Sequence, residues 1–286
     1  ILSACLHFVD NEEQVHDTDS DQYNPLFKIQ PLIDIVAANW RIAVKTGPLV
    51  SLDESMVPFR GRFQARQYIK SKHHRYGVKG FALCDAQTCY CIKYDIYSGR
   101  FYDYDRDLGQ GCSVVLKLAQ GLPEGTIFFT DSFYTSPTLA EQLMAVDKGI
   151  CGTVQKNRRG MPDALKERPT YDAKFMFKDP ILAVSFKDRN DVRMITTVHD
   201  TEVRDRVGRG SAAERRRGLC DENGQLTRRI PHMTFEYNVF MRGVDGLDQL
   251  LSYNTYQHRT RKVYEAIQLL LGYLTDQFQD SFGEAS

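Results

Sequence analysis

Three aspartates lie at positions where the expected strands and helices could bring their carboxylates close together. Asp53 ends the apolar run "GPLVSLD", Asp131 ends "GTIFFTD", and Asp245 lies in "GVDGLDQ". Asp248 follows Asp245 by three residues, so the two share a face if the segment is helical. Carboxylates about 4 Å apart repel by roughly 4 kcal/mol at an effective dielectric of 20. Such a group is therefore stable only around cations or when it holds protons.

Oxygen-only ligands favour magnesium or manganese over zinc. Two such ions roughly 3.5 to 4 Å apart can activate a water or a 3′ hydroxyl and stabilise the leaving oxygen in phosphodiester cleavage or strand transfer. We therefore predict that Asp53, Asp131 and Asp245 are catalytic and bind two Mg²⁺ ions, for which Mn²⁺ can substitute. In the alternative interpretation each acid is an ordinary turn or cap residue, and the pattern alone leaves this open.

A basic stripe follows the first of these acids. No acid occurs from Pro58 to Lys79, whereas residues 1–27 contain six acids and no Lys or Arg. Basic stripes with interleaved aromatic residues suit a polyanion, although a charge run can also be a solvated face. The candidate DNA contacts in the stripe are Arg60, Arg62, Lys70, Lys72, Arg75 and Lys79, and Arg259 and Arg261 are further candidates near the C-terminus. His73 and His74 are expected to meet phosphate or solvent rather than metal.

Composition limits the possible classes of protein. Lys plus Arg equals Asp plus Glu at 37 each, and the 42% hydrophobic fraction indicates a globular chain. The seven cysteines have no CxxC spacing, which predicts a reducing compartment and neither a disulfide framework nor a structural zinc site. We expect a soluble intracellular protein without membrane partners. Since the chain begins without Met and ends in "GEAS", we expect it to be a piece of a longer protein.

The order of expected elements indicates the fold class. After a helix within residues 24–45, strands are expected at "GPLVSLD", "VKGFALCD" and "CYCIKYDIY", followed by a helix at "CSVVLKLAQG", a strand at "GTIFFTD", a helix capped by Ser136 and a strand at "GICGTV". This is the order of the ribonuclease-H-like fold. The predicted fold class is α/β, with a mixed sheet flanked by helices and an insertion domain before the last catalytic helix.

The predicted insertion follows "GICGTV". It is expected to hold a strand pair at "ILAVSF" and "VRMITTV" and then "RDRVGRGSAAERRRG", which is biased enough to be disordered. A long amphipathic helix is expected near residues 263–278. The predicted parts are 1–47, an N-terminal helical segment; 48–154, the first part of the catalytic domain; 155–235, the insertion domain; and 236–286, the C-terminal helices of the catalytic domain.

Five ordered blocks resemble the motifs of piggyBac-type transposases: "DESMVPFRGR", "YIKSKHHRYGVKGFALCD", "TDSFYTSPTLAEQL", "GTVQKNRR" and "YNVFMRGVDGLDQ". The resemblance runs from about residue 20 to residue 280. It implies metal-dependent cleavage through hairpin intermediates and integration at TTAA sites, with the catalytic acids on Asp53, Asp131 and Asp245 and a supporting, metal-binding acid on Asp248. It also implies double-stranded DNA as partner, a homodimer on DNA and a nuclear location.

The chain departs from the family pattern at a few positions. Ser132 stands where the family often has Asn, and Val263 and Tyr264 stand where it typically has Arg-Trp. The 286 residues contain no cysteine-rich pattern like that of the family's DNA-recognition domain. These departures spare the acids and are expected to alter the handling of DNA ends. Two other functions stay open: a domesticated DNA-binding or chromatin protein without cleavage activity, and a ribonuclease-H-like nuclease outside transposition.

Overall fold

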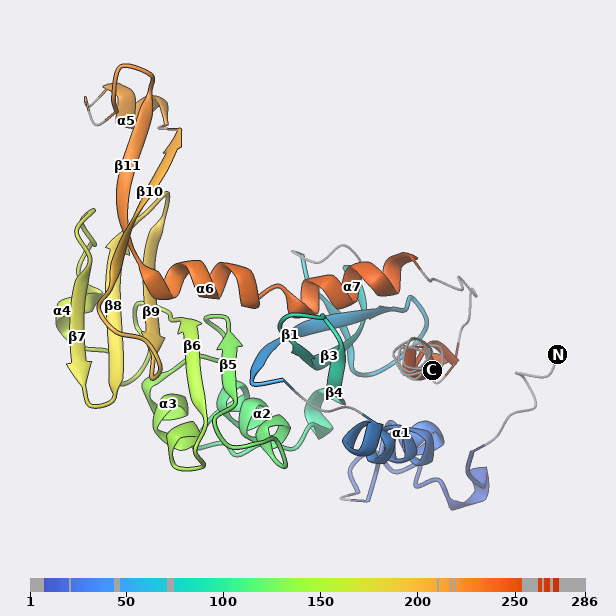
Figure 1. Ribbon diagram of the computed structural model, residues 1–286. Helices are drawn as coiled ribbons and strands as arrows, with labels where there is room; N and C mark the ends of the chain where they lie inside the picture. The colour runs from blue at the N-terminus through green and yellow to red at the C-terminus, as the bar shows by residue number, and fades with distance from the viewer. Residues whose placement is uncertain are drawn as a thin grey trace, which may run out of the picture. The chain divides into compact units, whose positions relative to one another are not determined.

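The computed structural model forms two compact units (Figure 1). One comprises residues 1–47, 51–105 and 242–286, and the other residues 48–50 and 106–241. The structure describes residues 8–20, 22–43, 47–70, 75–209, 211–216, 218, 220–253, 262–263, 265–267 and 270–272.

The first unit combines a small sheet with two longer helices. Its elements are α1 (Gln30–Ala43), β1 (Leu49–Pro58, from Ser51 onward), β2 (Arg66–Tyr68), β3 (Tyr76–Asp85), β4 (Cys91–Ile96) and α7 (Gly243–Tyr253), with short 3-10 helices at Asn11–Glu13, Phe27–Ile29 and Gly99–Phe101. β3 lies between β2 and β1 and also pairs with β4. A core that includes Val57, Val78, Val244 and Leu247 joins the strands to α7.

The second unit is a mixed sheet with helices beside it. Its elements are α2 (Gln110–Ala119), β5 (Ile127–Thr130), α3 (Pro137–Met144), β6 (Gly149–Thr153), α4 (Asp163–Lys166), β7 (Lys174–Lys178), β8 (Ile181–Lys187), β9 (Asp191–Thr196), β10 (Val203–Arg209), α5 (Ala212–Arg216), β11 (Gln225–Pro231) and α6 (His232–Phe240). The strand order is β5-β6-β9-β8-β7. β5 and β6 are parallel, whereas the later neighbours are antiparallel. Phe129, Val184 and Met194 are in its core.

The succession of strands and helices predicted for residues 48–154 is confirmed, with the short β2 as an addition. Asp131 directly follows β5, as expected. The Ser136 hydroxyl accepts a hydrogen bond from the Leu139 amide at 3.0 Å and Pro137 opens α3, which confirms the predicted cap. The strand pair expected in the insertion is confirmed as the β8–β9 hairpin.

The end predicted for the first strand was wrong. β1 continues to Pro58, so Asp53 lies in its middle. The strand continues because Met56 and Val57 are buried and Glu54 forms an ion pair with Lys79 of β3, so the acids do not end the pairing. Ile35 of α1 is 59% exposed, because the buried face of this helix runs through Val36.

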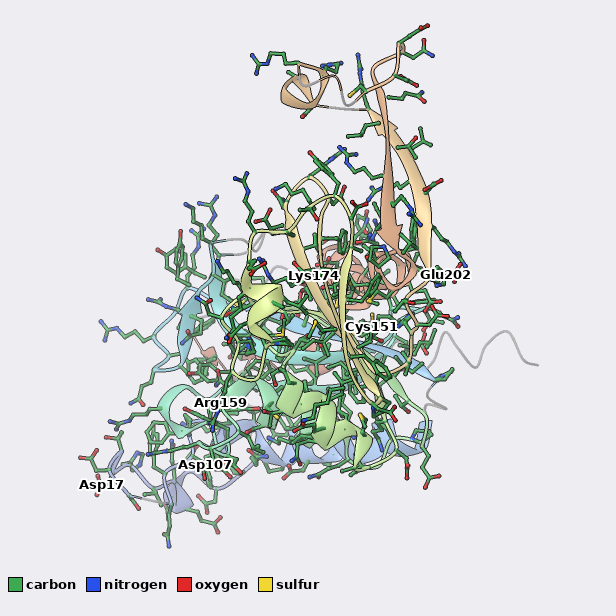
Figure 2. The ribbon with its side chains drawn as sticks, turned by 90° about the vertical axis from the view of Figure 1, so that its left-hand side faces the viewer. Asp17, Asp107, Cys151, Arg159, Lys174 and Glu202 are labelled. Carbon is green, nitrogen blue, oxygen red and sulfur yellow. The ribbon has the colours of Figure 1, made fainter. Side chains whose placement is uncertain are left out.

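The expected disorder after residue 203 was also wrong. β10 pairs with β11 along its whole length, from Val203 opposite Pro231 to Arg209 opposite Gln225. Most of β10 is exposed, whereas Leu226, Arg228 and Ile230 of β11 are buried, so β11 anchors a polar strand. Figure 2 shows Glu202 at the base of this two-stranded ribbon, where it accepts a hydrogen bond from Arg204.

Residues 155–235, the predicted insertion, contain α4, α5 and β7 to β11. β9 pairs with β6, so strands of this segment extend the sheet that precedes it. Within the described part of the chain, every helix is too short or too polar to cross a bilayer.

Candidate active site

One face of β1 carries a serine, an aspartate and a second serine. Successive side chains of a strand point to opposite faces, so Ser51, Asp53 and Ser55 share one side. Both serines are fully buried, and Asp53 is partly exposed. On the opposite face, Glu54 forms an ion pair with Lys79 at 3.1 Å. The strand thus directs the first predicted catalytic acid and its serine neighbours to one side.

Helix α7 packs on this face of β1. A Cβ placed on Gly243 would lie 2.2 Å from the Ser51 hydroxyl oxygen, so only glycine permits this approach. Five residues later, Asp248 Oδ1 accepts a hydrogen bond of 2.6 Å from the Ser55 hydroxyl.

Asp245 lies between Gly243 and Asp248, in the first turn of α7, and its side chain is exposed. Asp53, Asp245 and Asp248 therefore belong to two elements that pack together, although 192 residues separate the first acid from the second.

Asp131 occupies a tightly bonded turn of the second unit. Its Oδ1 accepts a hydrogen bond from the Phe133 amide at 2.9 Å, and its main-chain carbonyl accepts one from the Thr135 hydroxyl at 2.8 Å. The Arg158 guanidinium donates to the carbonyls of Ser132 and Phe133. These bonds fix the backbone that carries the second predicted catalytic acid.

The four acids are divided between the units, since Asp53, Asp245 and Asp248 belong to the first and Asp131 to the second. Among the described residues, no three His, Cys, Asp or Glu side chains are grouped so as to hold a metal ion. The donor chemistry nevertheless fits the predicted cation, because carboxylate oxygens are the ligands that Mg²⁺ and Mn²⁺ prefer. The two-ion site stays a prediction.

The predicted phosphate contacts have different environments. Arg60, Arg62, Lys70 and Arg75 are exposed, whereas the Lys79 side chain is 14% exposed and paired with Glu54. The Arg66 guanidinium donates to the carbonyls of Arg60 and Gly61, both at 2.9 Å, which holds the loop that carries Arg60 and Arg62. Lys72, His73, His74, Arg259 and Arg261 lie outside the described residues.

Three contacts that shape the site were not predicted: Ser55 with Asp248, Gly243 with Ser51, and Arg158 with the turn after Asp131. A signal for Ser55 was present, because a serine on the buried part of a strand needs a hydrogen-bond partner. The sequence contains no comparable signal for the partner itself.

Comparison with known proteins agrees with this architecture. The model of the family described as "Transposase IS4" matches residues 1–275. Human "PiggyBac transposable element-derived protein 3" is 26% identical over 279 residues, which cover 93% of this chain and 44% of the relative. The human "Chimeric ERCC6-PGBD3 protein" is also 26% identical, and the match covers 25% of it. The chain thus spans less than half the length of these relatives.

A solved structure, the piggyBac transposase synaptic complex with hairpin DNA, superimposes with a TM-score of 0.77 at 26% identity. The match covers 96% of this chain and 53% of that one. This likeness confirms the predicted ribonuclease-H-like fold class. The chain belongs to the Transposase IS4 family and, within it, to the piggyBac-type transposases and their derivatives.

Proposed function

We propose that this chain is the catalytic core of a DNA transposase that cleaves phosphodiesters and joins strands at TTAA sites. The observation that supports this most directly is the packing of α7 on β1. It places the helix that carries Asp245 and Asp248 against the strand that carries Asp53, within one unit. Chemistry that needs several carboxylates requires such convergence of distant segments.

In this proposal Asp53, Asp131, Asp245 and Asp248 hold two Mg²⁺ ions, for which Mn²⁺ can substitute. Bound ions would activate the attacking water or 3′ hydroxyl and stabilise the leaving oxygen. The chain's own side chains orient the catalytic acid and the DNA. The Arg158 guanidinium holds the turn of Asp131, and exposed Arg60 and Arg62 bind DNA phosphates, which positions the duplex without reading its sequence.

The proposed substrate is a transposon end in double-stranded DNA. The solved relative is a complex with hairpin DNA, which supports a hairpin intermediate here. A homodimer on DNA and a nuclear location complete the proposal.

The test is hairpin opening. The chain is incubated with an end-labelled duplex that is closed by a TTAA-containing hairpin, in Mg²⁺ and separately in Mn²⁺. We expect opened product from the wild type and none from Asp53→Asn or Asp131→Asn, because amides ligate hard cations more weakly than carboxylates. Asp103→Asn, which changes an exposed acid of the first unit, is the matched control and should leave opening unchanged. Opening by Asp131→Asn at the wild-type rate would refute the assignment.

A second function has specific support. One human relative is named as a transposable element-derived protein, so a domesticated DNA-binding or chromatin protein without cleavage activity is the alternative. The same assay separates the two functions. A wild-type chain that binds the duplex but opens no hairpin with either ion would favour the domesticated protein.

A further inference from the structure

The hydroxyl of Ser55 holds an acid that lies far away in the sequence. Its Oγ donates to Asp248 Oδ1 at 2.6 Å, and 193 residues separate the two. Ser55 is fully buried and Asp248 is partly buried, so water has little access to the donor end of the bond. Hydrogen bonds to a carboxylate in such an environment are short and strong, and they fix the orientation of the acceptor.

The same strand contains an internal comparison. Ser51 is equally buried and lies on the same face of β1, also against α7. Its hydroxyl, however, has no hydrogen-bond partner within the described part of the chain. Two serines of one strand thus have the same burial and the same neighbouring helix, and they differ in whether they bind an acid.

A buried tyrosine lies near Ser55. Tyr94 of β4 crosses β3 at Gly80, where a Cβ would lie 2.2 Å from the phenol oxygen. It thereby reaches Ser55 of β1, the other neighbour of β3. Burial raises the pKa of the Tyr94 phenol, an effect that the neighbouring Ser55 hydroxyl partly offsets. The Tyr94 hydroxyl has no hydrogen-bond partner within the described part of the chain, so it does not draw the Ser55 hydroxyl away from Asp248.

We propose that Ser55 is a positioning residue for divalent-cation binding: it orients the Asp248 carboxylate beside the face of β1 that carries Asp53. The inference rests on the proposed function, in which these acids hold the ions. Partners that orient a metal ligand from outside the coordination sphere typically contribute about 10- to 100-fold in metal affinity. Ser55 does not itself touch metal or DNA in this proposal.

The test measures binding of Mn²⁺ alone to the whole chain by titration calorimetry, with melting curves at each Mn²⁺ concentration. We expect Ser55→Ala to weaken Mn²⁺ binding about 10-fold or more and to reduce the Mn²⁺-dependent rise in melting temperature accordingly. Ser55→Thr keeps a hydroxyl and should restore most of the affinity. Ser51→Ala, the matched control, should bind Mn²⁺ as the wild type does.

A second readout distinguishes positioning from general damage. In hairpin opening, Ser55→Ala should need about 10-fold more Mn²⁺ for half-maximal rate, while the rate at saturating Mn²⁺ stays close to that of the wild type. If Ser55→Ala does not fold, Ser55→Cys, whose thiol is a weaker hydrogen-bond donor than a hydroxyl, should show a smaller shift in the same direction.

The outcomes separate this inference from the proposed function. If the wild type binds Mn²⁺ and Asp53→Asn abolishes binding, but Ser55→Ala binds normally, the Ser55 inference is overturned and the proposed function stands. Equal losses in Ser51→Ala and Ser55→Ala would also overturn it, because packing would then be the cause. A wild type that binds no Mn²⁺ would refute both.

Discussion

Replacing Gly243 by alanine tests whether the close approach of α7 to β1 is required. The new Cβ would lie 2.2 Å from Ser51 Oγ, 3.1 Å from the Asp85 carbonyl oxygen and 3.3 Å from Cys84 Cβ. Ordinary contact begins at 3.4 Å, and two of these neighbours are backbone or Cβ atoms that cannot rotate away. The start of the helix must therefore move, and Asp245 in its first turn moves with it.

The expected magnitudes follow from this shift. Overpacking a buried contact typically costs about 1 to 3 kcal/mol, which urea unfolding of the variant should detect. A displacement of roughly 1 Å at an active site can cost about 100-fold in rate. We therefore expect the rate of hairpin opening by Gly243→Ala to be about 100-fold lower than that of the wild type. This loss should exceed the loss that the reduced fraction of folded protein would cause.

Two further variants sharpen the test. Gly272→Ala changes a helical glycine whose new Cβ would meet no atom of the described residues within 4 Å, so it should be neutral or slightly stabilising. Adding Ser51→Ala to Gly243→Ala removes the oxygen that is approached most closely and should restore part of the stability, with a coupling energy on the order of 1 kcal/mol. A Gly243→Ala chain with wild-type stability and rate, or a double variant no better than the single one, would refute the reasoning.

Further predictions concern the other elements. Asp131→Asn should abolish hairpin opening without lowering the melting temperature in the absence of metal; a lower melting temperature would indicate a structural role instead. Neutralising Arg60 and Arg62 to Gln should reduce the slope of log affinity against log salt by roughly one unit for each phosphate that is no longer neutralised, and an unchanged slope would indicate a solvated face. Burial raises the pKa of the Cys151 thiol, so at pH 8 it stays protonated and should react with a thiol reagent far more slowly than the less buried Cys220; equal rates would contradict its burial.

Local pattern was sufficient for much of the catalytic domain. Short apolar runs marked β3 and β5, and the Ser136-Pro137 pair marked the start of α3, because caps and short apolar runs are local signals. Asp131 was placed at the end of its strand for the same reason, one residue beyond the observed end of β5. Local pattern failed where long-range pairing decided the structure. β10 reads as polar and disordered, yet it is a strand because β11 supplies its hydrogen bonds and the buried residues that anchor the pair.

The sequence by itself determined which acids to consider and the order of the elements that carry them. Only the tertiary structure decided that Ser55 bonds Asp248, that Gly243 lets α7 approach Ser51, and that Arg158 holds the turn of Asp131. Each of these contacts joins segments that are many residues apart in the chain, and two of them depend on how strand β1 packs against helix α7. Such packing is set by the whole unit and is not encoded in the periodicity of a single segment.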